Sequence, residues 1–422
     1  MFKVFANAWK IAELRTKILF TLLLIVVFRL GSAIPVPFIS AAELKALTEG
    51  GQSLFSMFDI MSGGAFSNAT IFAMGITPYI NSSIILQLLT VAIPALERKA
   101  KEGEEGRKFI AQLTRYFTIV LAFIQATGLY FGLKGAFTQR GFLTYVVVTL
   151  TFTAGTAFLM WLGEQINEKG IGNGISLIIF AGIISRGPAM INSFIELNKS
   201  GTLNIALTAL IIIVAVAVVA IVVLMNDAER RIPVQYAKRV VGRKMYGGQS
   251  THIPIKVSMA GVMPIIFAIS IISFPATICQ LLGVKAGDPG FWGGFLKVMS
   301  QGSVVYGVIY FLLIIFFTYF YTEMQYNPIE MANNMKQNGG FVPGIRPGRP
   351  TSDFIRSILN KITLVGAIFI ALIAVLPMFL SSVAPGIAFG GTSVLIVVGV
   401  ALETVKQLES QMLMRHYKGF LE

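Results

Sequence analysis

The chain has 422 residues, of which 55% are hydrophobic and 13% are charged, and its formal net charge at pH 7 is +14. Soluble domains carry about 25% charged residues, so this composition excludes the soluble fold classes and indicates a polytopic membrane protein. The single cysteine, Cys279, lies in an apolar run, so the chain cannot form a disulfide framework within itself.

The N-terminal stretch, residues 1–17, is amphipathic and basic, and it runs into an apolar segment without a small-residue cleavage site. We interpret it as a retained helix on the membrane surface rather than a cleaved signal peptide. Ten apolar runs are long enough to span a bilayer, which takes about 20 residues of helix. These runs are residues 18–36, 71–93, 113–133, 142–162, 174–191, 203–225, 257–282, 304–326, 358–380 and 389–405.

The Lys and Arg residues divide unevenly between the connecting loops. With the N-terminus in the cytosol, 26 of the 34 fall on the cytosolic side and seven on the outer side, while Arg29 lies within the first span. The positive-inside rule therefore predicts ten spans with both termini in the cytosol. We expect two halves of five spans, residues 1–190 and 203–422, joined by a hinge loop at 191–202, with the halves inverted relative to one another.

The segment LFSMFDIMSGGAF, residues 54–66, is apolar but too short to cross a membrane. Gly63 and Gly64 interrupt it and are its predicted hinge, and a full span follows almost at once. Non-helical backbone at membrane depth is tolerated only where protein or a water-filled cavity surrounds it. The segment therefore predicts a re-entrant half-helix that lines or blocks a path.

Motifs for catalysis, nucleotide hydrolysis and metal binding are missing from the sequence. It contains two histidines, His252 and His416, and no HExxH, GxSxG or GxxxxGK[ST] pattern. The GIGNG stretch at 170–174 is expected to shape a turn and a helix start rather than to bind phosphate. Ion carriers place ionisable groups in the middle of the membrane, whereas here Asp59 is expected to be locally satisfied and Arg29 to reach outward or pair with an acid. The sequence thus favours neither an enzyme nor a metal site.

Two cytosolic loops are longer than simple connectors. Within residues 226–256, short β-type runs lie on both sides of a Gly-Arg-Lys tip. This pattern predicts a hairpin-like projection. Residues 327–357 are rich in Gly and Pro, and a rigid loop would give Arg346 and Arg349 definite directions. Such basic loops suit an acidic protein face or ribosomal RNA phosphate; the alternative is charge that only sets topology.

Eight motifs resemble the SecY family of bacteria, the pore subunits of the general protein-translocation channel. They are IPVP (Ile34–Pro37), MSGGA (Met61–Ala65), GITPYINSSIILQLLT (Gly75–Thr90), MWLGEQI (Met160–Ile166), GIGNGIS (Gly170–Ser176), QSTHIPIKV (Gln249–Val257), FVPGIRPG (Phe341–Gly348) and FGGTSVLIVV (Phe389–Val398). The resemblance covers nearly the whole chain, in matching order. It implies an all-α polytopic membrane protein with ten transmembrane helices, in two pseudo-symmetric halves that open like a clamshell around a central pore.

The resemblance also implies roles for individual residues. The plug would be residues 55–66 and include Phe55, Met57, Phe58, Asp59, Ile60, Met61, Ser62, Gly63 and Gly64. The apolar pore ring would be Ile76, Ile80, Ile179, Ile266 and Ile396. The lateral gate, between spans two and three and spans seven and eight, would include Asn81, Gln87 and Phe274. Docking of a motor or the ribosome would use Arg239, Arg243, Lys244, Arg346 and Arg349.

The implied function is passive conduction of unfolded secretory polypeptides across the bacterial cytoplasmic membrane, with lateral release of transmembrane segments into lipid. The implied partners are SecE, SecG, the SecA ATPase, the ribosome, signal sequences and membrane lipid, and no cofactor is implied. Because the chain carries no motor, the energy would come from outside it. The alternatives are a secondary transporter of a small solute, which would need an ionisable coupling site, and a membrane-embedded enzyme, which would need a clustered nucleophile or metal site.

Overall fold

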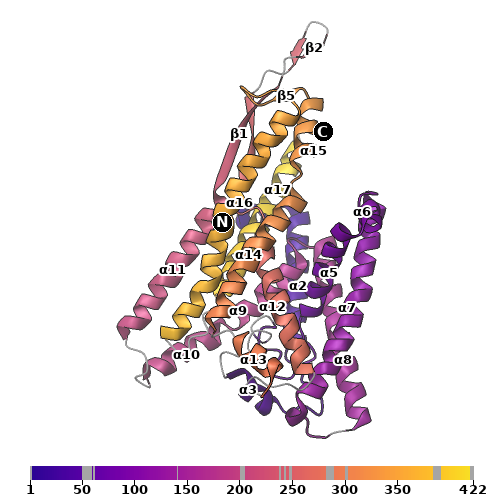
Figure 1. The fold of residues 1–422 in the computed structure, drawn as a ribbon, viewed down its shortest axis with the longest axis vertical. Coiled ribbons are helices and arrows are strands. Elements are labelled where there is room, and N and C mark those ends of the chain that lie inside the picture. Colours follow the sequence, from indigo (N-terminus) through magenta and orange to yellow (C-terminus); the bar gives the residue numbers. More distant parts are fainter. Residues whose placement is uncertain are drawn as a thin grey trace.

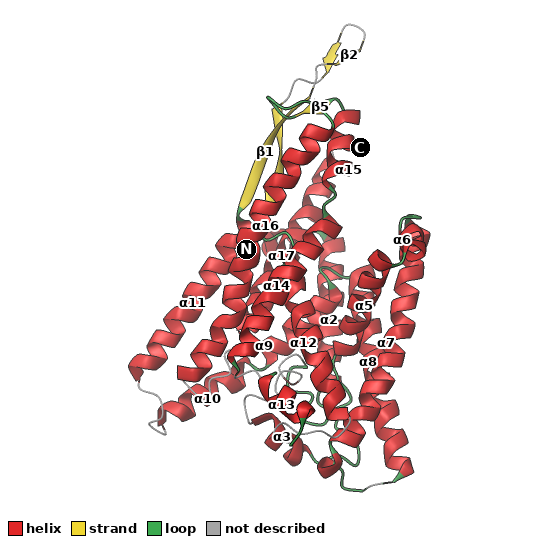
Figure 2. Ribbon diagram, viewed as in Figure 1, coloured by secondary structure: helices red, strands yellow, loops and turns green. Residues whose placement is uncertain are grey.

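Helices dominate the chain (Figures 1 and 2). A computed structural model describes residues 2–49, 59, 62–139, 141–199, 205–236, 239–241, 244–246, 250–281, 289–299, 303–383 and 391–418. The helices are α1 (Phe2–Lys10), α2 (Ala12–Gly31), α3 (Ala41–Glu49), α5 (Thr77–Ala92), α6 (Pro94–Ala100), α7 (Glu104–Gly132), η1 (Lys134–Ala136), α8 (Phe142–Lys169), α9 (Gly174–Ser185), α10 (Gly187–Lys199), α11 (Ile205–Asp227), α12 (Met263–Leu281), α13 (Phe291–Val298), α14 (Val304–Gln325), α15 (Pro328–Gln337), α16 (Arg349–Val383) and α17 (Gly391–Lys418). The strands are β1 (Glu229–Tyr236), β2 (Arg239–Val241), β3 (Lys244–Tyr246), β4 (Ser250–Lys256) and β5 (Gly340–Phe341).

Each of the ten predicted apolar runs falls on one of these helices, namely α2, α5, α7, α8, α9, α11, α12, α14, α16 and α17. By length and composition, five helices in the described ranges could cross a membrane, or six if α5 and α6 form one span bent by 106°. α9 and α12 are shorter apolar helices. The predicted helical membrane fold is confirmed, while the count of ten spans stays a prediction.

Several predicted boundaries differ from the observed helices. The fifth span's helix, α9, ends at Ser185, and the seventh span's helix, α12, begins only at Met263. The first span's helix ends at Gly31. The second begins only at Thr77, because residues 71–76 form turns and Pro78 occupies its first turn, where the missing N–H costs no helical hydrogen bond. The segment predicted as a hinge loop, 191–202, is helical as far as Lys199 in α10. The division of the chain into two halves stays a prediction.

The helices pack as two groups that meet along two seams. In the first group α5 packs on α7, α7 on α8, and α8 on both α2 and α9. In the second group α12 packs on α14, α14 on α16, and α17 on both α16 and α11. Between the groups, α12 packs on α5 and α7 along one seam, and α9 packs on α17 along the other (Figure 1).

The N-terminal segment forms α1, as its amphipathic pattern predicts, and α1 packs on α2 and α17. Ala8 and Leu14 are buried against Ile171 and Leu408 in a small apolar cluster. The first helix is therefore anchored to the last one, around Leu408.

The GIGNG turn joins α8 to α9 through side-chain caps and close backbone packing. Asn167 Oδ1 accepts a hydrogen bond from the Gly174 N–H at 2.7 Å, and Asn173 caps α9 by accepting from the Ser176 N–H at 3.2 Å. A Cβ on Gly174 would overlap the carbonyl oxygen of Gly163. The expected turn and helix start is confirmed, and its glycine permits a close approach of two backbones.

Replacing Gly174 with alanine should destabilise the chain by about 1–3 kcal/mol, since overpacking a filled site forces the backbone to shift. The measurement is the thermal unfolding midpoint of the purified protein in detergent. Gly294→Ala is the matched control, because a Cβ at that helical position meets nothing within 4 Å. An equal midpoint for the two variants would contradict the packing argument.

Candidate functional site

The five isoleucines of the predicted ring lie on, or directly before, four of the helices at the two seams. Ile80 is on α5, Ile179 on α9, Ile266 on α12 and Ile396 on α17, and Ile76 caps the N-terminus of α5. Their exposed fractions are between 2% and 6%, and all five belong to one buried apolar cluster. The structure therefore brings the predicted set together where the two helix groups meet.

The five isoleucines of this cluster carry no group that could bind a ligand through hydrogen bonds or charge. Branched hydrocarbon side chains offer no hydrogen-bonding group, so a constriction lined by them excludes water without holding a particular ligand. Ile76 and Ile80 are four residues apart and share a face of α5. The same cluster includes Ala65 and Phe72 from the turns that precede α5, so the plug segment and the ring share one core.

The predicted gate residues lie on the two helices of one seam. Asn81 and Gln87 are on α5, and Phe274 is on α12. Asn81 is buried and Phe274 is exposed, while the Oε1 atom of Gln87 is buried without a hydrogen-bond partner in the described structure. α12 packs on both α5 and α7, and α14 packs on α12, so the four helices of the predicted gate are connected through α12.

Polar contacts tie helices together within each group. In the first group, Ser82 Oγ on α5 donates to the Thr114 carbonyl on α7 at 2.9 Å. Arg115 Nε on α7 then pairs with Glu164 Oε1 on α8 at 2.7 Å. In the second group, Lys406 Nζ on α17 lies 2.7 Å from the carboxylate of Asp227 at the end of α11. Each group is thus cross-linked by directional bonds.

Part of the predicted plug is described. Five of its predicted residues lie outside the described ones: Phe55, Met57, Phe58, Ile60 and Met61. Residues 62–66 form turns in which Gly63 and Gly64 have φ angles of +69° and +87°, a region that favours glycine. A Cβ on Gly63 would lie 2.7 Å from the Cα of Gly182 on α9. Gly63, predicted as a hinge, is therefore also the point where this segment touches α9.

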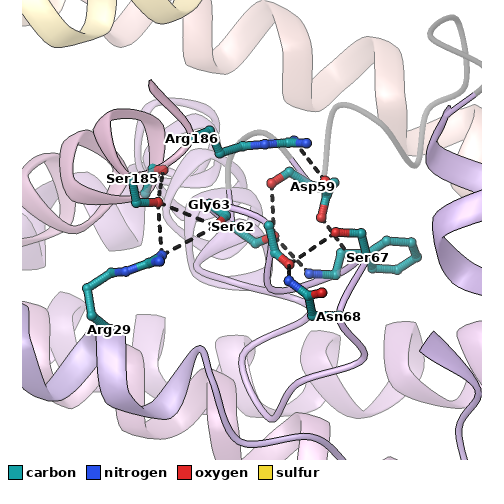
Figure 3. Close-up of polar contacts among 11 residues, drawn as sticks. Arg29, Asp59, Ser62, Gly63, Ser67, Asn68, Ser185 and Arg186 are labelled. Carbon is teal, nitrogen blue, oxygen red and sulfur yellow. Dashed lines mark hydrogen bonds and ion pairs between the residues drawn. The ribbon is translucent and has the colours of Figure 1, made fainter. Parts of the chain in front are cut away.

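Asp59 organises the polar contacts of the plug segment (Figure 3). Its Oδ1 accepts a hydrogen bond from the Ser67 N–H at 2.7 Å, and its carbonyl accepts from the Gly64 N–H at 2.9 Å. Its Oδ2 lies 2.7 Å from Nη1 of Arg186, which follows α9. Asp59 is therefore paired with a cation and hydrogen-bonded at Oδ1, while its buried Oδ2 has the ion pair but no hydrogen bond among the described residues.

Arg29 was expected to reach outward or to pair with an acid, and in the described structure it has no ion pair. Its Nη1 donates to Ser185 Oγ at 2.9 Å and lies 3.4 Å from the carbonyl oxygen of Gly63 (Figure 3). The sequence did not single out Ser185 and Arg186. The sequence feature that could have indicated these two residues is the polar Ser-Arg pair directly after the apolar run of α9.

The two loops predicted to be cytosolic form one structure, in which β1 is the central strand of a three-stranded sheet of order β4-β1-β5. β1 and β4 pair antiparallel from Glu229 opposite Lys256 to Gln235 opposite Ser250, and β2 pairs with β3 beyond them. The predicted hairpin projection is confirmed, and it extends past the helices at one end of the molecule (Figure 2).

The hairpin and the second loop share a core with α16. Ile232 and Val234 on β1 and Ile255 on β4 are buried against Ile355 and Leu359 of α16. Val342, from the second loop, is buried in the same cluster. The sheet is therefore held rigidly on the helix.

The predicted docking residues lie on this rigid part or at its tip. Arg346 and Arg349 are exposed, and the Arg346 carbonyl accepts a hydrogen bond from Thr351 Oγ1 at 2.8 Å. The backbone places Arg239 at the start of β2 and Lys244 at the start of β3, while Arg243 lies outside the described residues. The second loop is thus fixed in the way that would give Arg346 a definite direction.

The described residues offer no metal-binding site. Among the described residues, no group of three or more His, Cys, Asp or Glu side chains is placed to hold a metal ion. The geometry instead offers a buried apolar cluster, a segment that shares its core, a seam between helices and a projection that carries basic residues.

The family model and the curated relatives that match this chain agree on one family. The family model described as SecY matches residues 70–405. Protein translocase subunit SecY of Bacillus subtilis (strain 168) is 46% identical over 436 residues, covering 100% of both chains.

Two solved structures have a similar fold. A structure concerning the SecY plug domain and the closed state of the translocation channel aligns with a TM-score of 0.69 at 21% identity, over 94% of this chain and 92% of that one. Sec61 in a canine ribosome-channel complex from the endoplasmic reticulum aligns with a TM-score of 0.62 at 20% identity, with the same coverage.

Substituting Ile355 with alanine should loosen the sheet from α16, because removing a fully buried large side chain costs about 2–5 kcal/mol. We expect faster proteolytic cleavage within residues 226–256 of the purified protein. Leu364→Ala is the control on the same helix, since Leu364 is half exposed. Equal cleavage rates in the two variants would show that the shared core does not hold the hairpin.

Proposed function

The chain belongs to the SecY family, and from that membership we infer that it is the pore subunit of a protein-translocation channel. It conducts unfolded polypeptides through a membrane and is not an enzyme. The observation that carries this function is the set of five isoleucines, which come from four helices and meet in one buried cluster along the two seams. Parting the helix groups at those seams would open a path through that cluster.

We propose that Ile76, Ile80, Ile179, Ile266 and Ile396 form the pore ring. A passing polypeptide presents every kind of side chain, so its channel must seal without recognising any of them. An apolar constriction meets both requirements, because it excludes water when narrow and forms no specific hydrogen bond when occupied. The plug segment would add a second closure, as the shared core of Ala65 and the ring supports.

The seam between α12 and the α5–α7 pair is the proposed lateral gate, with Asn81, Gln87 and Phe274 on its two sides. Its opening would expose an apolar segment of the translocating chain to lipid, where about 20 apolar residues in a helix are stable. The unpartnered Oε1 of Gln87 supports this role. A buried amide without a partner costs free energy in the closed state, so this contact is easier to separate.

The sheet and the loop with Arg346 and Arg349 are the proposed docking surface. The similarity to Sec61 in a ribosome-channel complex supports a ribosome as one partner, and the basic surface suits RNA phosphate or an acidic motor protein. We further propose SecE, SecG and the SecA ATPase as partners, together with signal sequences and membrane lipid. The energy comes from the motor or the ribosome.

The proposed location is the bacterial cytoplasmic membrane, with both termini in the cytosol. The excess of Lys and Arg on one side supports this orientation. So does the packing of α1 on α17, the last helix of the chain. The alternative function, a secondary transporter of a small solute, is not favoured, because the central cluster is built from hydrocarbon side chains rather than an ionisable coupling group.

The pore assignment is tested by crosslinking a stalled secretory chain to single cysteines at positions 76, 80, 179, 266 and 396, after Cys279 has been replaced by alanine. We expect adducts at these positions, because the chain must pass through the ring. A cysteine replacing Leu150, which is exposed on the outer surface of α8, is the control and should give none. Absence of adducts at all five positions would overturn the pore assignment.

Reversing the charge at Arg346 with glutamate should reduce motor-driven export into reconstituted vesicles about tenfold or more, since truncating one charge of a docked pair costs about 2–5 kcal/mol. Lys361→Glu makes the same charge change on α16, about 18 Å further along the helix from Arg349 at 1.5 Å per residue, and should leave export nearly unchanged. Normal export by the Arg346 variant would exclude that loop from docking.

A further inference from the structure

The short helix α13 exposes an apolar face in the part of the molecule that lies away from the β-hairpin (Figure 1). Residues 289–299 around it carry one charged residue, Lys297. We propose that α13 is a membrane anchor, which inserts Phe291 and Trp292 into the lipid interface of the outer leaflet and holds the outer end of α12 at that depth. The assignment to the outer leaflet rests on the proposed function, whereas the contact with lipid does not.

Aromatic rings form the exposed edge of α13. Phe291 is 78% exposed and Trp292 is 52% exposed. The ring centroid of Trp292 lies 5.5 Å from that of Phe291 and 6.2 Å from that of Phe295, both in edge-on contact. Tryptophan favours the boundary between lipid and water, because its ring is apolar and its N–H still needs a polar partner. An exposed aromatic cluster of this kind therefore suits the membrane interface.

The opposite edge of α13 fastens the helix to α12. Leu296 is buried in one small cluster with Cys279, near the end of α12, and Phe295 packs against the same pair. Gly293 is also buried, and it lies three residues before Leu296 on the same face. α13 thus has an apolar sector of which the protein covers only one side.

The one charged side chain of α13 lies away from the aromatic edge. Successive residues of a helix are about 100° apart, so Lys297 lies about 160° around the helix from Phe295 and about 140° from Trp292. Lys297 is exposed. A polar and an apolar side arranged in this way are typical of a helix that lies in the plane of the interface.

The helices that α13 connects present apolar faces of the same kind. On α12, Phe274 and Ile278 are exposed and lie four residues apart on one face. On α14, Val304 and Val308 are likewise four residues apart, and both are exposed. α13 therefore lies in the chain between two helices whose outer faces suit lipid, which favours lipid over a second protein as the occupant of its own exposed face.

An anchor at this place restricts how α12 can move. Trp292 contacts Phe295, and Phe295 packs on Cys279, so the interface is connected to the end of α12 through side-chain contacts. Pro275 lies inside α12, four residues before Cys279, and it lacks the N–H of one helical hydrogen bond. The anchored turn thus keeps its depth, while the part of α12 that carries Ile266 can move about Pro275.

The first experiment measures where the side chains of α13 lie in the membrane. A spin label is attached to Trp292→Cys or to Lys297→Cys, each in a Cys279→Ala background. The full complex, with cysteine-free partners, is reconstituted into vesicles of phosphatidylethanolamine and phosphatidylglycerol. Oxygen, which concentrates in lipid, and a water-soluble nickel chelate serve as relaxation agents. We expect oxygen to dominate at position 292 and the nickel chelate to dominate at position 297.

Two results would overturn the anchor. Dominance of the nickel chelate at both positions would place the aromatic edge in water. Low accessibility of position 292 to both agents would show that another protein covers it.

The second experiment uses the native Cys279, which is 1% exposed, as a reporter of the hold on α12. The double variant Phe291→Ser with Trp292→Ser should raise the rate at which a water-soluble maleimide labels Cys279 in the reconstituted complex about tenfold or more, because it removes both aromatic side chains from lipid. Trp292→Phe keeps a large apolar ring and should label as slowly as the parent chain.

Val304→Ser is the matched control, since it removes an exposed apolar side chain from α14 and should leave the labelling rate unchanged. Equal rates in the double variant and the parent would contradict the link between the anchor and α12. If the double variant fails to assemble, the spin-label comparison still decides whether α13 contacts lipid. Failure of the channel function would show separately, as a parent complex that does not export, while both measurements would still report the anchor.

Discussion

The buried apolar cluster that joins the two helix groups contains the five isoleucines of the proposed pore ring, and the proposed opening depends on how this apolar contact holds. Apolar contact is non-directional and roughly proportional to the area removed from water, so two surfaces can separate and close again without matching donors to acceptors. A seam joined instead by buried ion pairs would leave uncompensated charges whenever it opened. The apolar contact of the proposed pore ring is therefore better suited to repeated opening than a contact made by buried ion pairs.

Directional bonds occur where no separation is needed. Ser82 with Thr114, and Arg115 with Glu164, fix three helices of the first group, while Lys406 with Asp227 fixes two helices of the second. These bonds lie within the groups and not across the seams, which suits the opening at the seams that we propose. The contacts of Asp59 and Arg29 follow the same division, because they join the plug to helices of the first group.

The sequence predicted the structural elements that depend on residues close together in the chain. Hydrophobic runs predicted the helices, β-type runs around a basic tip predicted the hairpin, and the GIGNG glycines predicted a turn. The sequence did not predict contacts between distant segments. Asp59 pairs with Arg186, which lies 127 positions further along the chain, and the residues around neither of them indicate this partner. The resemblance to a family supplied the five isoleucines, which on periodicity alone are indistinguishable from any other buried hydrocarbon in a membrane helix.

The shared core makes the two loops that contain β1–β4 and β5 structurally dependent on each other. Ile232 and Val342 lie about a quarter of the chain's length apart in sequence, yet both are buried in one cluster with Ile355 and Leu359 of α16. Excising either loop would strip apolar cover from the other, so a deletion in one would register as a defect in both. The two loops form a composite epitope, and only exposed point substitutions can separate their contributions.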